Sequence, residues 1–198
     1  MRHTLPILIA TVALLTLASC RAPQKAAPEP QAEAVEQETA GPIWRDILFE
    51  DLPLLGHRNW IVVADAAFPL QISPGMDVVV SGEDHFVVLD EVLKAVAAAG
   101  HVRPKIWLDK ELDFVPEALA PGADAARKRL HEALTGFEVK PLLHEELIAR
   151  LDQVAKTFRI LMIKTNLKIP YTTVFMELDC GYWSPESEAK MREAMKGK

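Results

Sequence analysis

Trp60-Ile61-Val62-Val63-Ala64 is an unbroken run of apolar residues, followed directly by Asp65. A short run of this kind is typical of a strand that is buried on both faces of a sheet. Two later runs, residues 158–163 and 173–178, have the same character and are separated by the polar turn 164–170. We therefore expect at least three buried strands.

Helical periodicity alternates with these strands along the chain. Apolar residues over 44–55 share one helical face that ends at Gly56, and a helix over 86–99 is expected to stop at Gly100. Ser184 is placed to cap a last helix that begins at Pro185. Weaker patterns predict strands at 77–80 and 105–108, an extended segment at 137–139, and helices at 123–134 and 144–156. The expected fold is α/β, a three-layer α/β/α sandwich with a mixed, largely parallel sheet.

The overall composition limits the classes of partner. Of the 198 residues 49% are hydrophobic, which excludes disorder for most of the chain. Lys and Arg number 22 against 28 Asp and Glu, so the net charge is −6. An acidic protein repels a phosphate backbone, and we predict no nucleic-acid partner.

The N-terminal segment has the pattern of an export signal. A basic start and an apolar stretch over 1–19 resemble a secretory signal peptide, and Leu17-Ala18-Ser19-Cys20 resembles the lipobox of bacterial lipoproteins. The alternative is an ordinary signal peptide with an incidental cysteine. We expect acylated Cys20 and a disordered tether over 20–42, then one folded domain over 43–198. Arg21 after the cysteine favours the outer membrane, facing the periplasm, over the inner membrane.

Several common catalytic motifs do not occur in the sequence. Neither GxGxxG, GxxxxGK[ST] nor GxSxG is present. His144-Glu145-Glu146-Leu147-Ile148 begins like a zincin helix, but its second histidine position is occupied by isoleucine. The histidines show no paired spacing of the kind metal ligands use, so we predict no metal site. We expect His85, His101 and His131 to be solvated on surface helices.

One stretch combines a histidine and an acid around the first strand. His57 precedes the buried run and Asp65 follows it, at the end of a strand, where α/β proteins place their sites. Residue chemistry also fits a structural interpretation, with His57 as a cation at a helix end and Asp65 as a turn residue.

The segment Gly56-His57-Arg58-Asn59-Trp60-Ile61-Val62-Val63-Ala64-Asp65-Ala66-Ala67-Phe68-Pro69 resembles the one that opens the D-ribose pyranase and L-fucose mutarotase family. The blocks 143–147 and 164–173 resemble two later family segments, so the resemblance covers about residues 55–181. It implies His57 as the general acid and Asp65 as a sugar-binding group. It also implies that His144, Tyr171 and position 173 complete the sugar pocket. Thr173 stands where the ribose branch has Asn, and Asn166 and Leu167 replace Gly and Glu.

This resemblance leads us to expect a monosaccharide mutarotase or pyranase that opens and recloses a ribose- or fucose-like sugar without a cofactor. It also implies a homo-oligomer, of which a decameric ring is one form, in which one subunit helps build a neighbour's pocket. A non-catalytic carbohydrate- or small-ligand-binding lipoprotein on the same fold is the alternative. An interaction scaffold with no sugar pocket is a third interpretation.

Overall fold

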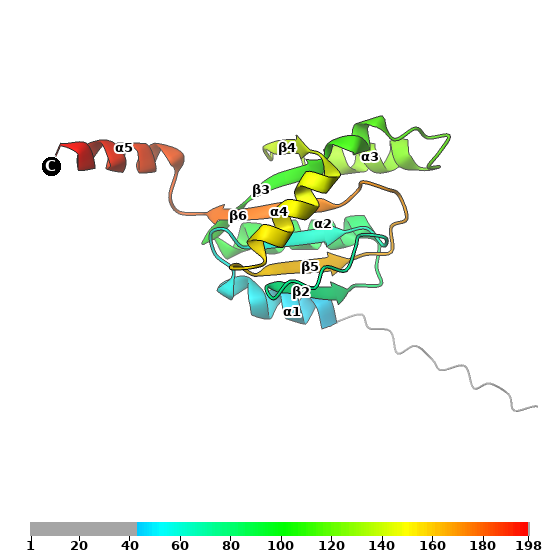
Figure 1. Ribbon diagram of the computed structural model, residues 1–198, viewed down its shortest axis with the longest axis horizontal. Coiled ribbons are helices and arrows are strands. Elements are labelled where there is room, and N and C mark those ends of the chain that lie inside the picture. The colour runs from blue at the N-terminus through cyan, green and yellow to red at the C-terminus, as the bar shows by residue number, and fades with distance from the viewer. Residues whose placement is uncertain (1–42, 198) are drawn as a thin grey trace, which may run out of the picture. The chain divides into compact units, whose positions relative to one another are not determined.

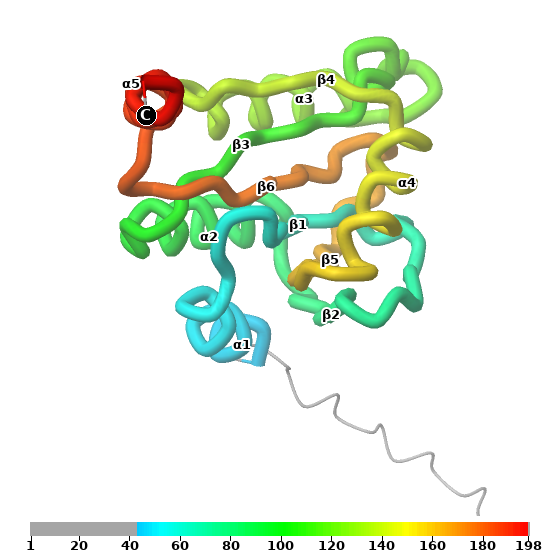
Figure 2. Tube along the Cα trace, turned by 60° about the vertical axis from the view of Figure 1, so that its left-hand side comes forward, coloured from blue at the N-terminus to red at the C-terminus, as the bar shows by residue number. Residues whose placement is uncertain are grey.

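In the computed structural model, which describes residues 43–197, the run Trp60–Ala64 forms strand β1 inside a six-stranded sheet. Figure 2 follows the strands across the sheet in the order β2, β5, β1, β6, β3, β4. β6 is antiparallel to both its neighbours, and the other strand pairs are parallel. The sheet is therefore mixed and largely parallel, as predicted. The predicted signal peptide, Cys20 and the predicted tether lie outside the described residues.

Helices and strands largely alternate along the chain. In order they are α1 (Ile43–Asp51), the 3-10 helix η1 (Leu52–Leu54), β1 (Trp60–Ala64), β2 (Met76–Val80), α2 (His85–Ala99), β3 (Val102–Asp109), the 3-10 helix η2 (Lys110–Phe114), α3 (Ala123–Ala133), β4 (Val139–Leu142), α4 (His144–Val154), β5 (Ile160–Lys164), β6 (Val174–Cys180) and α5 (Pro185–Lys196).

Helices cover both faces of the sheet, which gives the three layers. Alternate residues of β1 point to opposite faces: Ile61 and Val63 pack with α1, α2 and α3, whereas Trp60 and Val62 pack with α4. In Figure 1, α4 crosses in front of the strands and α2 lies behind them. Of the described helices, α5 has no buried residue, and none is long and apolar enough to cross a membrane.

The predicted helix boundaries have identifiable physical causes. Gly100 ends α2 in the left-handed conformation with φ of 66°, and the Ser184 side chain accepts a hydrogen bond from the backbone N of Ser187 to cap α5. The first helix is shorter than expected: α1 ends at Asp51, and Pro53 lies in the 3-10 turn η1 that follows. Proline lacks the backbone N–H that a continued α-helix needs.

Gly75 allows close contact between the loop before β2 and the end of α4. Its backbone N donates to the carbonyl of Ala155 at 2.8 Å, and a Cβ added to it would lie 2.6 Å from that same oxygen. We expect Gly75→Ala to lower the free energy of unfolding by about 1–3 kcal/mol, because backbone would have to move. Urea unfolding followed by circular dichroism measures the change. Gly56→Ala is the matched control, since a Cβ there meets nothing within 4 Å. Equal unfolding midpoints for the two variants would contradict the prediction.

Candidate active site

The carboxylate of Asp65 is held at the edge of the sheet by Thr173. Val63 of β1 pairs with Val174 of the antiparallel β6, so the residue after one strand lies next to the residue before the other. The Thr173 hydroxyl donates to Asp65 Oδ2 at 2.9 Å and accepts from the Asp65 backbone N at 3.2 Å. The second oxygen, Oδ1, accepts from the backbone N of Ala67 at 2.9 Å. Both carboxylate oxygens are thus fixed, and both side chains are buried.

A second acid and a histidine meet beside this pair. His144 begins α4, and its Nδ1 lies 3.0 Å from Oδ1 of Asp109, the last residue of β3. Glu111 accepts hydrogen bonds from the His144 backbone N through both carboxylate oxygens at 3.1 Å. Burial raises the pKa of the Asp109 carboxyl to about 6, although its hydrogen bond to His144 favours ionisation. The negative charge of Asp65 also acts to raise this pKa, which places the two acids within electrostatic reach of each other.

Two aromatic rings hold the His144 imidazole between the loops. The Phe68 ring lies 5.9 Å from it at an interplanar angle of 80°, and the Tyr171 ring lies 5.3 Å from it at 83°. Tyr171 has a positive φ of 62°, a conformation that is unusual for a bulky residue and that concentrates at functional sites. The structure therefore brings together four predicted site residues from three segments: Asp65, His144, Tyr171 and Thr173.

His85 was expected in solvent, and that prediction is wrong. Asp84 caps α2 by accepting from two backbone N–H groups, so the helix starts at His85, and the His85 side chain is directed inward. The Thr165 hydroxyl donates a hydrogen bond to the carbonyl of Ala64, and the same hydroxyl oxygen lies 3.0 Å from His85 Nδ1. Burial lowers the pKa of His85 to about 4, so the ring is neutral at ordinary pH. His85 thus supports the end of β1 behind Asp65. Of the other two, His131 is exposed as expected and His101 is partly buried.

His57, the predicted general acid, lies at the opposite edge of the sheet. It precedes the first residue of β1 while Asp65 follows the last, and the five residues of β1 alone span roughly 16 Å at about 3.3 Å per residue. The His57 side chain is 57% exposed, and its Nε2 lies 3.8 Å from Asp179 Oδ1. Within one chain, His57 and Asp65 cannot contact the same sugar ring.

Asp179 holds a small cluster of cations around His57. Its Oδ2 lies 3.0 Å from Arg103 Nη2 and 3.1 Å from Lys105 Nζ. Burial opposes ionisation of Asp179, but the hydrogen bonds from these two cations outweigh it and lower the pKa to about 2. Asp179 is consequently ionised at any ordinary pH and anchors the edge of the sheet where His57 lies.

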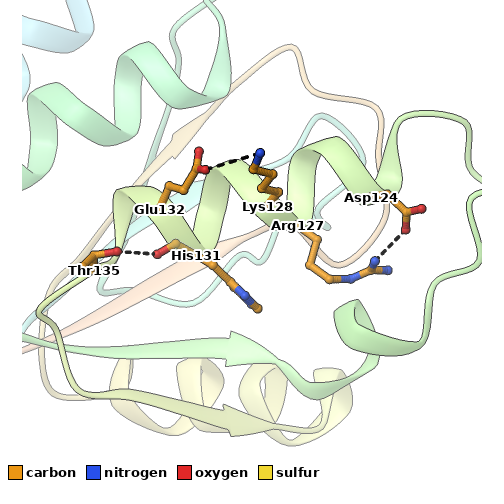
Figure 3. Close-up of a pocket in the computed structure, with 6 residues that line it drawn as sticks. All are labelled: Asp124, Arg127, Lys128, His131, Glu132 and Thr135. Carbon is orange, nitrogen blue, oxygen red and sulfur yellow. Dashed lines mark hydrogen bonds and ion pairs between the residues drawn. The ribbon is translucent and has the colours of Figure 1, made fainter.

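The surface of α3 carries a hollow whose polar groups pair with one another. Figure 3 shows Arg127 paired with Asp124 and Lys128 paired with Glu132. The nitrogen–oxygen distances in these ion pairs are 2.7 and 3.8 Å. His131, on the same helix, lies 3.8 Å from Asp113 and is as exposed as His57. The Lys128–Glu132 and His131–Asp113 pairs are solvated and contribute little to stability. The partly buried Arg127 guanidinium, by contrast, also donates to the backbone carbonyls of Leu112 and Val115. The His131–Asp113 pair therefore matches the His57–Asp179 pair in its separation and in the exposure of its histidine.

Residues 43–197 include no group of three or more His, Cys, Asp or Glu side chains arranged to hold a metal ion. The acid and base groups of the site are instead organised in hydrogen-bonded pairs, Asp65 with Thr173 and Asp109 with His144. Such pairs suit proton transfer and the binding of hydroxyl groups.

Sequence reasoning missed three residues of this region: Asp109, Glu111 and His85. Asp109 carried a usable signal, because like Asp65 it is an acid at the carboxyl end of a buried strand. Glu111 and His85 carried none, since their partners are 33 and 80 positions away along the chain.

Comparison with known proteins gives similarities of fold at low sequence identity. No protein-family model and no curated protein matches the chain. Among solved structures, RbsD of Bacillus subtilis complexed with D-ribose is 21% identical, with a TM-score of 0.46, over 71% of this chain and 93% of that one. The fucose mutarotase of Streptococcus pneumoniae in complex with L-fucose is 16% identical, with a TM-score of 0.47, over 72% and 94%. FucU of Bifidobacterium longum is 16% identical, with a TM-score of 0.43, over 70% and 94%. D-ribose and L-fucose are the ligands bound in the first two of these solved structures.

Proposed function

We propose that this protein interconverts the cyclic forms of a free ribose- or fucose-like monosaccharide by general acid/base ring opening. The observation that carries the proposal is the meeting of the Asp65 carboxylate and the His144 imidazole at one edge of the sheet, each fixed by a second side chain. Mutarotation needs one group to take the proton of the anomeric hydroxyl and another to protonate the ring oxygen. A positioned acid or base contributes roughly 10²–10⁴-fold to such a step.

Space for a sugar adjoins these groups. A hollow of about 490 Å³ is bordered by Tyr171 and Glu111, and its remaining wall is apolar, formed in part by Phe114 and Leu119. This volume lies in the range of small-molecule sites, and a few polar groups at the edge of an apolar wall are the usual design. We propose that the polar side of the sugar faces Asp65 and His144 while its carbon face lies along this wall.

We propose that His57 acts on the site of another copy of the chain. Since His57 and Asp65 of one chain lie at opposite edges of the sheet, a site that uses both must combine two copies. A homo-oligomer, of which a decameric ring is one form, would bring them together. We further propose that Cys20 anchors each copy to the membrane and that the tether lets several copies reach one surface.

A non-catalytic sugar-binding protein is the second candidate, and one observation favours it. The Thr173 hydroxyl is fully buried and its proton is donated to Asp65, so it has no donor with which to hold a sugar as an amide would. Loss of one sugar contact can leave binding without turnover. Direct contact between Thr173 and a sugar remains a prediction.

Exchange spectroscopy distinguishes these candidates. We expect the full chain to accelerate exchange between the anomers or ring forms of at least one sugar among ribose, fucose and galactose, measured by NMR saturation transfer. Binding seen by saturation-difference NMR without faster exchange would support the non-catalytic candidate. Neither binding nor exchange with any of the sugars would contradict both and leave the scaffold interpretation.

A further inference from the structure

The Asp109 carboxylate has an unusual place in the fold. Its side chain is fully buried, and its one hydrogen bond among the described residues goes to the imidazole of His144. Its other oxygen, Oδ2, is buried and has no hydrogen-bond partner within residues 43–197. Burying a carboxylate costs stability unless its oxygens are satisfied. The single hydrogen bond of Asp109 therefore stabilises the fold by less than the burial of its carboxylate costs.

The other acids nearby hold backbone instead. Asp65 accepts from the backbone of Ala67, and Glu111 accepts from the backbone of His144. Asp84 accepts from two backbone groups at the start of α2. Asp109 differs from all three because its bond goes to a titratable ring. The arrangement orients the imidazole.

The second nitrogen of His144 is the one left for a ligand. With Nδ1 directed at Asp109 and the ring held by Phe68 and Tyr171, the orientation of the imidazole is fixed. The side chain is 22% exposed, and among the described residues no hydrogen bond involves Nε2. An ionised Asp109 accepts a hydrogen bond from Nδ1–H, which leaves the lone pair of the neutral ring on Nε2.

We propose that Asp109 and His144 form a carboxylate–imidazole dyad in which His144 is the base of the ring-opening step and Asp109 is its positioning residue. The proposal rests on the proposed function. His144 Nε2 takes the proton of the anomeric hydroxyl, and a C1=O1 double bond forms. The C1–O5 bond breaks, its electron pair goes to O5, and O5 takes a proton from a second acid, which the proposed function assigns to His57 of another copy. Reclosure reverses these transfers, so no further reactant is consumed.

The dyad predicts a dependence on pH with a definite sign. The charged or titratable groups around Asp109 are His144 from α4, Glu111 from η2 and Asp65 after β1, with Tyr171 against the imidazole. Because the pKa of Asp109 is raised to about 6, its carboxyl is protonated below that pH. The protonated carboxyl then donates a hydrogen bond to Nδ1 instead of accepting one. The ring proton consequently sits on Nε2, which no longer has a lone pair to act as a base. The exchange rate should fall as the pH is lowered through about 6.

Asp109→Asn tests the dyad in the full chain. An amide of nearly the same shape cannot ionise and can present an N–H to Nδ1, which favours the wrong tautomer. We expect kcat for exchange to fall by about 10- to 1000-fold, with KM little changed. The pH at which the exchange rate falls, near 6 in the wild type, should also change in this variant. A merely structural role for Asp109 would leave that pH unchanged. Asp113→Asn, in the exposed His131–Asp113 pair, is the matched control and should keep the wild-type rate and profile.

Each outcome has one meaning. The dyad is overturned if the wild type is active, the Asp109→Asn variant has the same kcat, and its rate falls at the same acidic pH as that of the wild type. A wild type that exchanges no sugar overturns the proposed function, which is a different failure. If thermal unfolding shows that the Asp109→Asn variant is not folded, His144→Gln is tested in its place. That variant must lose the same 10-fold or more for the dyad to stand.

Discussion

Replacing His57 by alanine should remove most of the exchange activity and leave the fold intact. If His57 is the acid that protonates the ring oxygen, its loss costs about 10²–10⁴-fold in kcat. Its side chain is more than half exposed and its ion pair with Asp179 is long, so the free energy of unfolding should change by less than about 1 kcal/mol. NMR exchange rates and thermal unfolding measure the two effects. His131→Ala is the control, because His131 has the same exposure and the same 3.8 Å separation from an aspartate.

The same variant tests whether two copies share a site. We expect His57→Ala and Asp65→Asn to be inactive separately and to regain activity when coexpressed. With random mixing the rate should reach at most about a quarter of wild type, because about one site in four then holds both native residues. If Asp65→Asn does not fold, His144→Gln is the second partner. Two inactive variants that stay inactive together in a mixed oligomer, or a clean monomer by light scattering, would exclude a shared site.

Much of the fold follows from local sequence patterns. β1 was predicted because five apolar residues in a row are compatible with burial on both faces, and both faces of β1 are buried. The end of α2 at Gly100 and the cap of α5 at Ser184 depend on single residues with strong local preferences, and both are confirmed. The strand β6 is longer than predicted, reaching Cys180, because its last residues pair with the start of β3. Such pairing between distant segments leaves no local pattern.

The site was less predictable, for the same physical reason. Family resemblance and strand ends pointed to Asp65 and His144, and the structure places both at one edge. What joins them depends on which strands become neighbours: Asp109 reaches His144 only because β3 ends beside the start of α4. The family resemblance assigned both His57 and Asp65, eight residues apart in the sequence, to the sugar site. An extended strand between them places them far apart instead.

Thr173→Val should have the largest effect on stability of the variants considered, and it should also lower activity. The hydroxyl of this fully buried side chain satisfies two groups of Asp65, the Oδ2 atom and the backbone N. Valine has a similar shape but leaves both of these groups unpaired, at about 1–3 kcal/mol each, so we expect a loss of about 2–6 kcal/mol in the free energy of unfolding. Asp65 would also lose its orientation, and exchange should fall with it.

Thr173→Ser separates the hydroxyl from the methyl group. It keeps both hydrogen bonds and removes one buried methyl, so it should cost about 1 kcal/mol and retain most of the activity. Urea unfolding and NMR exchange on the two variants give the comparison. If valine and serine destabilised equally, the methyl group rather than the hydroxyl would be what holds Asp65. If the valine variant kept its rate, the position of the Asp65 carboxylate would not matter for exchange, and a sugar-binding role for Asp65 would have to be abandoned.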